Sequence, residues 1–212
     1  MSSTYDVRVD ATTGVDAAVL SLKRGALVVL PTDTVYGVAA DAFDPAAVGR
    51  LLVAKGRARD MPVPVLVGSW RGIDGLAQDV TPLTRTLVET FWPGPLTLVV
   101  RAAPSLAWDI GETMGTVAVR MPLQPVALSV LDRTGPLAVS SANRTGAPPA
   151  TDADDAESQL GTAVETYLDA GPIGAPIPST ILDLTGEKPR LIRAGALATD
   201  RLAEVVPGLD VT

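Results

Sequence analysis

The sequence predicts an α/β fold in which helices cover most of one sheet. Helix-like and strand-like stretches alternate along all 212 residues, without a clear linker or an internal repeat. Apolar residues make up 47% of the chain and charged residues 19%, as expected for a protein with a substantial core. Because only 4% of residues are aromatic, aliphatic side chains must fill that core. These features favour one domain spanning residues 1–212.

The first predicted elements are a helix, a strand and a second helix. Apolar residues over 15–22 have helical spacing, and a cationic turn and a glycine follow them. The run ALVVL at residues 26–30 predicts a buried strand. Asp44 and Pro45 have the residue types of a helix N-cap and first turn, and Gly56 ends the helix that they begin.

A strand and a helix follow. Residues 63–67 are apolar, and Pro62 and Pro64 confine this strand to a sheet edge or to a strand start. Thr81-Pro82 begins a helix with one apolar face, and residues 92–95, WPGP, end it.

The second half of the chain contains more strands than helices. Residues 125–131 and 198–205 predict helices, and the Pro/Asp-rich stretch 147–155 predicts a loop that leads into a short helix. Apolar runs predict strands over residues 96–101, 116–120, 136–140, 167–169, 179–184 and 190–193.

Two residue types are missing from this chain, and their absence restricts its chemistry. Without Cys there is no disulfide, zinc-thiolate site or thiol nucleophile. Without His there is neither the commonest general base near neutral pH nor the commonest transition-metal ligand. Chemistry must therefore use carboxylates, Lys, Arg, hydroxyls, backbone amides or a cation that arrives with the substrate.

Charge and hydropathy limit the partners. The chain has 17 Lys and Arg against 24 Asp and Glu, a net charge of −7, which argues against a broad nucleic-acid-binding face. No uncharged apolar run of about eighteen residues exists, so a membrane span is not expected. The polar start has no signal-peptide pattern. We expect a cytoplasmic protein.

Two stretches in the first third of the chain are candidates for a binding site. Residues 31–37, PTDTVYG, place hydroxyls, a carboxylate and a phenol directly after a strand, where α/β sheets often bind ligands, although a capped turn has the same composition. In the second, Lys55, Arg57 and Arg59 alternate where a helix ends. A helix C-terminus favours cations, which explains Lys55 but not the two arginines beyond Gly56. Such cations suit phosphates or carboxylates.

Two later stretches add further candidates. Strand alternation over 116–120 places Thr116, Ala118 and Arg120 on one face, and an arginine there requires either an anionic ligand or an internal acidic partner. Residues 139–146, VSSANRTG, lead from a strand into a loop rich in small donors, which fits either phosphate binding or an ordinary capped turn. There is no Walker A, GxGxxG or GxSxG motif.

Read together, these stretches resemble the YrdC/Sua5 family of threonylcarbamoyl-AMP synthases. The matching text, in family order from about residue 15 to about residue 205, is PTDTVYGVAADAFD, KGR, DMPVPVLV, FWPGPLTLVV, TVAVRMP, SSAN, STILDL and LIRAG. The resemblance implies the YrdC-like fold, a twisted mixed sheet with flanking helices and a large concave cavity. It also implies the short form without the C-terminal Sua5 domain.

The function implied is the condensation of L-threonine, bicarbonate and ATP to L-threonylcarbamoyl-AMP and pyrophosphate. Mg²⁺ would arrive with ATP, with no fixed metal site on the protein. A separate threonylcarbamoyltransferase, bound transiently, would then modify adenosine 37 of ANN-decoding tRNAs, and tight tRNA binding or membrane association is not expected.

The resemblance also implies residue roles. Lys55 and Arg57 would be catalytic and would hold the ATP phosphates. The implied ATP contacts are Lys55, Arg57, Met61, Thr116, Val139, Ser141, Asn143 and Arg193. The implied L-threonine contacts are Thr34, Arg120, and Ser179 or Thr180, two neighbours between which the sequence does not decide.

The chain departs from the family pattern at three positions. Ala58 stands where many relatives have Pro, and Met61 and Leu66 stand where many have polar ligand contacts. Two other functions stay open, namely an RNA-binding or ribosome-maturation module and a carbamoyl-transfer module of the same fold.

Overall fold

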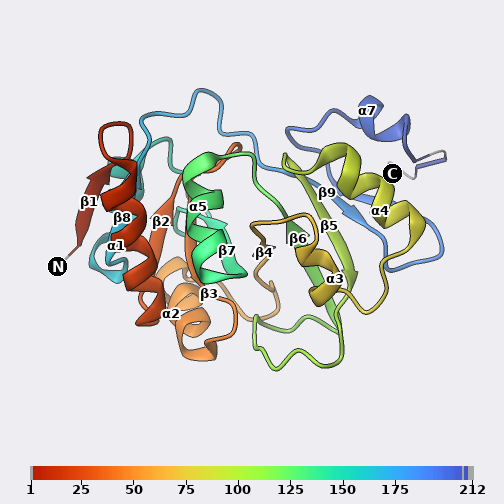
Figure 1. Cartoon of the computed structure of the whole chain (residues 1–212), viewed down its shortest axis with the longest axis horizontal. Helices are drawn as coiled ribbons and strands as arrows, with labels where there is room; N and C mark the ends of the chain where they lie inside the picture. The colour runs from red at the N-terminus through yellow and green to blue at the C-terminus, as the bar shows by residue number, and fades with distance from the viewer. Residues whose placement is uncertain (1, 207, 210–212) are drawn as a thin grey trace.

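The computed structural model describes residues 2–206 and 208–209 and confirms the α/β fold (Figure 1). Its strands form one mixed sheet in the order β1-β8-β2-β3-β7-β4-β6-β5-β9-β10. The strands are β1 (Ser3–Asp6), β2 (Val28–Leu30), β3 (Gly37–Asp41), β4 (Val65–Leu66), β5 (Leu96–Arg101), β6 (Thr116–Arg120), β7 (Leu137–Ser141), β8 (Thr166–Asp169), β9 (Thr180–Asp183) and β10 (Arg190–Arg193).

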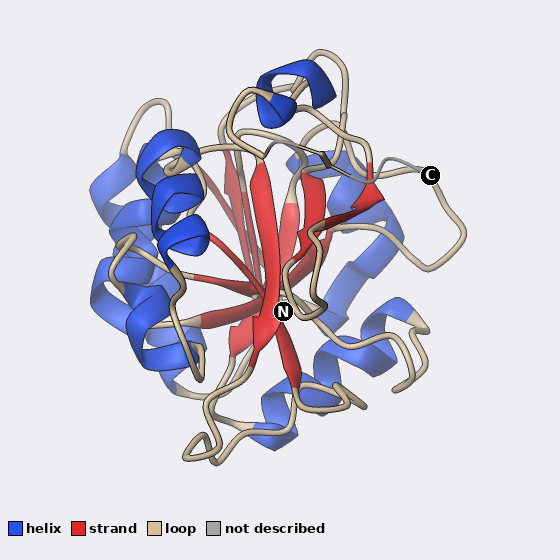
Figure 2. Cartoon of the chain, turned by 90° about the vertical axis from the view of Figure 1, so that its right-hand side faces the viewer, coloured by secondary structure: helices blue, strands red, loops and turns tan. Residues whose placement is uncertain are grey.

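Helices lie on both sides of this twisted sheet, whose strands fan out when viewed end-on (Figure 2). They are α1 (Ala11–Lys23), α2 (Pro45–Lys55), α3 (Gly72–Leu76), α4 (Pro82–Phe91), α5 (Pro125–Thr134), α6 (Ala153–Leu160) and α7 (Thr199–Ala203), with a 3₁₀ turn at Gly161–Ala163. One apolar cluster joins α1 and α5 to the sheet, and a larger one joins α2, α4 and α6 to it. Among the described residues no helix is long and apolar enough to cross a membrane.

Helix α2 has the boundaries that its sequence predicts. The Asp44 side chain caps its first turn by accepting hydrogen bonds from two backbone amides, at 2.9 and 3.1 Å. Pro45 occupies the first turn, and Leu51 lies on the buried face. Gly56 ends the helix with φ +61°, a left-handed conformation that favours glycine. This exit fixes the position of Lys55 at the helix C-terminus.

The centre of the sheet is occupied by the short strand β4. It lies between β7, to which it is antiparallel, and β6, to which it is parallel. Pro62 and Pro64 both precede it, so they mark a strand start and not a sheet edge.

Three elements were not expected from the sequence. Strand β1 is a short, mostly exposed edge strand, and α3 has glycines at two of its five positions. Strand β3 reads GVAAD, in which only Val38 has a strong strand preference, yet it pairs with β2 on one side and β7 on the other. Its two neighbours and full burial determine its conformation.

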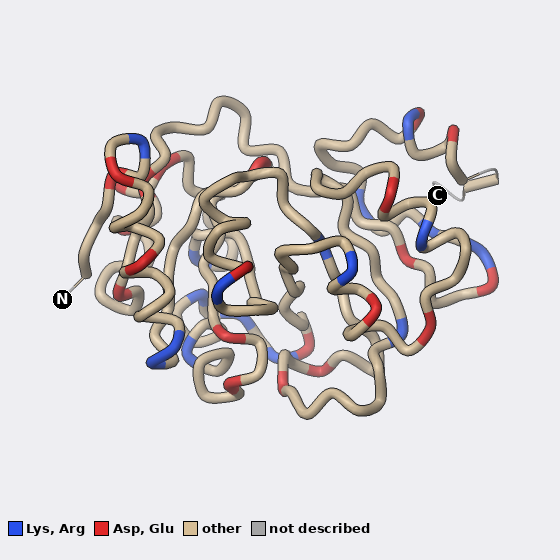
Figure 3. Tube along the Cα trace, viewed as in Figure 1, with Lys and Arg blue, Asp and Glu red and all other residues tan. Residues whose placement is uncertain are grey.

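Charged residues of both signs are distributed around the described part of the molecule. Figure 3 shows acidic and basic positions interspersed along the trace. Several exposed arginines pair with nearby or distant acids, as Arg8 does with Asp169 and Arg133 does with Asp16.

The Asp44 cap gives a prediction about stability. Asp44→Ala leaves two amides of the first turn of α2 without an acceptor and should lower the free energy of unfolding by about 1 kcal/mol. Urea unfolding followed by circular dichroism measures this change. Asp44→Asn keeps a capping oxygen and should recover most of the loss; an asparagine variant as unstable as the alanine variant would contradict the capping role.

Candidate functional site

The end of α2 meets the loop that follows β7. The Lys55 ammonium donates hydrogen bonds to the backbone carbonyls of Ser141 and Asn143, the latter at 2.6 Å, and lies 3.4 Å from Asn143 Oδ1. In the other direction, the amide of Thr145 donates to the Lys55 carbonyl at 2.8 Å. The KGR and SSAN stretches, about 86 positions apart in the sequence, therefore form one cluster.

Burial affects the charge of this lysine. Its exposed fraction is 3%, and burial together with the neighbouring Arg57 charge lowers the pKa of Lys55 to about 8. The group still carries a positive charge at neutral pH. An ammonium has three N–H donors, and two of them are taken by carbonyls. The third remains for Asn143 Oδ1 or for a ligand.

Arg57 has structural partners that the sequence did not reveal. Its Nε donates to the Met61 carbonyl at 2.7 Å and its Nη2 to the Pro62 carbonyl at 3.0 Å, so this arginine holds the loop after α2. Its Nη1 lies 3.5 Å from Ser140 Oγ, the longest of its contacts. The guanidinium is half-buried, and burial lowers the pKa of Arg57 below its usual value. Both partners are neutral carbonyls, so its positive charge is not neutralised.

The role that the sequence left open for Arg59 is an ion pair with Asp109. Both side chains are about half exposed, so the pair adds little to stability. Asp60, its neighbour in sequence, is not its partner.

Arg120 lies on the predicted face of β6 and contacts the PTDTVYG stretch. Its Nη1 donates to Thr34 Oγ1 at 2.7 Å, its Nε to the Gly94 carbonyl at 3.0 Å and its Nη2 to Asp33 Oδ1. The internal acid that the sequence analysis allowed for is therefore Asp33, 87 positions away. Burial lowers the pKa of Arg120, Asp33 opposes this shift, and the nearby Arg193 charge adds to it.

The neighbouring hydroxyls Ser179 and Thr180 differ in their surroundings. Thr180 is fully buried, and its Oγ1 both donates to the Leu197 carbonyl and accepts from the Leu197 amide. Ser179 Oγ instead lies 2.8 Å from Thr97 Oγ1 and accepts from Arg193 Nη2 at 3.2 Å. Arg193 also donates twice to the Ser179 carbonyl, at 2.8 and 3.0 Å. Ser179 is therefore the residue joined to the cation, while Thr180 belongs to the scaffold.

The remaining predicted contacts lie on the same strands and loops. Thr116 is half-buried at the start of β6 and donates to the Thr113 carbonyl at 2.8 Å, while the Met61 side chain is exposed. The Val139 side chain packs in the core against Gly37, where an added Cβ would lie 2.6 Å from Val139 Cγ1. Leu66, which replaces a polar residue of many relatives, is also a core residue.

Thr32 supports the hydroxyl that contacts Arg120. Thr32 Oγ1 lies 3.1 Å from Thr34 Oγ1, on the Arg120 side, while the Thr32 methyl faces Gly37, which packs against Val139 and Ser140. Asp33 and Thr32, which had no individual role in the sequence prediction, are thus part of the surroundings of Arg120. The available signal was an acidic residue between two threonines, opposite an arginine on a strand face.

These contacts determine what the cluster can do chemically. Two pairs of cations contribute: Lys55 and Arg57 at the end of α2, and Arg120 and Arg193 at the ends of β6 and β10. Hydroxyls and loop carbonyls are their neutral partners. The described residues contain no group of three acidic side chains that could hold a metal ion. The arrangement of cations suits the binding of anions.

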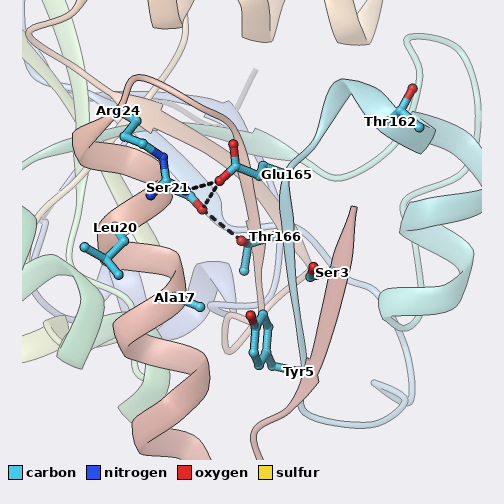
Figure 4. A pocket seen from close by; sticks show the side chains of 9 residues that line it. All are labelled: Ser3, Tyr5, Ala17, Leu20, Ser21, Arg24, Thr162, Glu165 and Thr166. Carbon is cyan, nitrogen blue, oxygen red and sulfur yellow. Dashed lines mark hydrogen bonds and ion pairs between the residues drawn. The ribbon is translucent and has the colours of Figure 1, made fainter. Parts of the chain in front are cut away.

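A separate pocket of about 420 Å³ lies between β1, α1 and β8 (Figure 4). Ser21 Oγ donates to Glu165 at 2.8 Å and lies 2.9 Å from Thr166 Oγ1, and Arg24 pairs with Glu165. Because its charged groups neutralise each other, this pocket lacks the unpaired cations of the cluster.

Comparisons with known proteins identify the family of this chain. A family model for Sua5, YciO and YrdC proteins, described as "Telomere recombination", matches residues 21–195. A protein of Mycobacterium tuberculosis named putative threonylcarbamoyl-AMP synthase is 57% identical over 197 residues. That match covers 93% of this chain and 90% of the relative.

Solved structures share the fold. Pyrococcus abyssi Sua5, solved in complex with L-threonine, matches with a TM-score of 0.93 and 32% identity. The match covers 100% of this chain but 62% of that one, so this chain spans less than two thirds of its length. E. coli YciO matches with a TM-score of 0.81 over 92% of this chain and 97% of that one, and at 21% identity it shows the fold alone. The chain belongs to the Sua5/YciO/YrdC family.

Proposed function

We propose that this protein is an L-threonylcarbamoyl-AMP synthase. The observation that carries the proposal is the arrangement of cations: Lys55 and Arg57 adjoin the C-terminal end of β7 and the loop after it, and Arg120 contacts Thr34. Two anionic substrates, a nucleoside triphosphate and an amino-acid carboxylate, require such sites. The Mycobacterium tuberculosis relative bears this name, and the Pyrococcus abyssi structure contains L-threonine.

The reaction has two steps. The neutral amine of threonine takes up CO₂, derived from bicarbonate, as a carbamate. A carbamate oxygen then attacks the α-phosphorus of ATP, and the bond to pyrophosphate breaks. Transfer at phosphorus depends mainly on positioning and on stabilisation of charge, so a chain without His or Cys can support it.

The ATP phosphates are assigned to Lys55, Arg57 and Arg193. Arg57 and Arg193 keep their full charge because their partners are carbonyls and hydroxyls. Lys55 contributes its charge and a third N–H, and also holds the carbonyls of Ser141 and Asn143, so that this loop is fixed before the nucleotide binds. Thr116 and Met61 are proposed to contact the nucleotide from neighbouring segments, while Val139, whose side chain lies in the core, supports the strand that leads to Ser141. Mg²⁺ is proposed to arrive on the phosphates of ATP.

The threonine substrate is assigned to Thr34, Arg120 and Ser179. A guanidinium has five N–H donors, and Arg120 uses three of them within the protein. One N–H on each terminal nitrogen remains for a carboxylate. Between the two neighbouring hydroxyls we favour Ser179, because Leu197 already occupies Thr180 as both donor and acceptor.

A second protein would use the product of this reaction, and two alternative functions differ from it in ways that can be tested. The adenylate would pass to a separate threonylcarbamoyltransferase that acts on tRNA, in the cytoplasm. An RNA-binding module would need a basic face, whereas cations and acids are interspersed here (Figure 3). A carbamoyl-transfer module would use carbamoyl phosphate in place of threonine, and substituting that compound in the assay separates the two functions.

The test of this function is pyrophosphate release when threonine, bicarbonate and ATP are omitted one at a time. Release should require all three, and Arg57→Ala should lower kcat/KM for ATP by about a hundredfold or more. Because Arg57 also holds the 58–62 loop, the variant's melting temperature is measured alongside and should fall by no more than about 4 °C. Near wild-type turnover in the folded variant would contradict the phosphate role of Arg57, and release without threonine would contradict the function.

Arg120 gives a second prediction. Arg120→Ala should raise the KM for threonine far more than that for ATP. The same change leaves Asp33 without its partner and should lower stability by about 3–5 kcal/mol. In the double variant Arg120→Ala/Asp33→Asn the buried charge is gone, so stability should largely return while the KM for threonine stays high. Equal increases in both KM values in the double variant would contradict the carboxylate role.

The lowered pKa of Lys55 predicts a pH dependence. Below pH 8 the ammonium is charged, and above it the amine becomes neutral and loses both the charge and the third N–H. ATP affinity should therefore weaken by about tenfold between pH 7 and pH 9.5. Isothermal titration with MgATP measures it. The Lys55→Met variant should bind more weakly at neutral pH and show no such change; the same pH profile in both proteins would exclude Lys55 as its source.

A further inference from the structure

The proposed site has to bind two kinds of anion and distinguish between them. A nucleotide carries several charges on its phosphates, whereas the amino acid presents one carboxylate. Both would be attracted by the four cations assigned to substrates, Lys55, Arg57, Arg120 and Arg193. Arg193 is close enough to Arg120 for its charge to lower the pKa of Arg120, which places a phosphate-side cation next to the proposed carboxylate site.

Three of the four cations bond only to neutral acceptors among the described residues. Lys55 bonds to loop carbonyls and lies near an amide oxygen, Arg57 bonds to carbonyls with a hydroxyl at 3.5 Å, and Arg193 bonds to the carbonyl and hydroxyl of Ser179. Neutral acceptors orient a cation without cancelling its charge. These groups therefore keep their attraction for a strongly charged ligand.

Arg120 is different because it pairs with a carboxylate. The side chains of Arg120 and Asp33 are 7% and 14% exposed, so little solvent screens the pair. Asp33 is itself held in place, since its Oδ1 also accepts the Leu123 amide at 2.9 Å. The carboxylate is thus a fixed part of the site.

The pair has no net formal charge, and this changes which anion it can bind. A single carboxylate can use the remaining N–H groups of Arg120 while the hydroxyl of Thr34 stays close. A pyrophosphate or triphosphate brings several negative charges against the fixed Asp33 carboxylate. Repulsion of this kind, between like charges across an interface, is a known means of rejecting wrong partners.

We propose that Asp33 is a specificity-determining residue that neutralises Arg120, so that this subsite takes the amino-acid carboxylate and rejects the phosphates of the nucleotide. The inference rests on the proposed function, because it assigns the amino-acid subsite to Arg120. Asp33 thereby adds a charged group with a role in binding to the PTDTVYG stretch, which already contributes the Thr34 hydroxyl.

Asp33→Asn tests the proposal, because asparagine keeps an oxygen for Arg120 and for the Leu123 amide but removes the charge. Threonine is titrated calorimetrically into each protein, with and without inorganic pyrophosphate. In the unmodified protein, pyrophosphate should change the apparent Kd for threonine by less than about twofold. In Asp33→Asn, pyrophosphate should raise it by about tenfold or more, because it now competes for Arg120.

Asp109→Asn is the matched control, since it removes an aspartate that pairs with another arginine, Arg59, outside the cluster. It should behave like the unmodified protein. Asp33→Ser removes the same charge with a shorter acceptor and answers the question if the amide disturbs the fold, which thermal unfolding reports.

Two results would overturn the proposal. One is a folded Asp33 variant in which pyrophosphate leaves threonine binding unchanged. The other is a folded variant that no longer binds threonine at all, which would make Asp33 a structural support for the guanidinium and not a charge filter. Failure of the unmodified protein to bind threonine would instead count against the proposed function.

Discussion

The burial of the Lys55 ammonium is the constraint on which the site depends. A buried charge is unfavourable unless hydrogen-bond acceptors surround it, and here the carbonyls of Ser141 and Asn143 supply them. To satisfy the lysine, the loop after β7 must turn its carbonyls toward α2. Gly56 ends α2 directly after this lysine, and the chain continues from there to Arg57. The hydrogen bonds of Lys55 therefore position two motifs that lie far apart in the sequence.

The remaining cations are positioned by the same principle with different partners. Arg57 and Arg193 are oriented by carbonyls, which leave their charge available, whereas Arg120 is oriented by a carboxylate, which does not. A chain without His and with a net charge of −7 thus keeps three cations of the candidate site free of acidic partners among the described residues. The chemistry proposed for the site needs no titrating base, because charge and position are what transfer at phosphorus requires.

Much of the fold could be predicted because its signals are local. The cap of Asp44, the proline at the start of α4 and the alternation of β6 each act within a few residues, and β5 and β6 have the predicted bounds. Strand β3 could not be predicted, because GVAAD has only one residue with a strong strand preference and forms a strand only when two neighbours pair with it.

In the candidate site too, only the features with local sequence signals could be predicted. The residue types at Lys55, Arg57 and Arg120 indicated anion binding, but their partners are set by tertiary contacts. Asp33 lies 87 positions from Arg120, and Asp109 lies 50 positions from Arg59. Nothing local distinguishes Ser179 from Thr180; the backbone of Leu197, 17 positions beyond Thr180, makes the difference. The sequence also gives no sign of the hydrogen bonds by which Arg57 holds the loop over residues 58–62, because their acceptors are backbone carbonyls.

The most direct measurement of the central claim follows carbon from bicarbonate into the product. The protein is incubated with ¹³C-bicarbonate, L-threonine and MgATP, and the nucleotides are analysed by mass spectrometry. We expect threonylcarbamoyl-AMP that carries the label, formed together with pyrophosphate and only when threonine is present. Consumption of ATP without a labelled adenylate, or a labelled adenylate formed without threonine, would contradict the assignment of the cations to these two substrates.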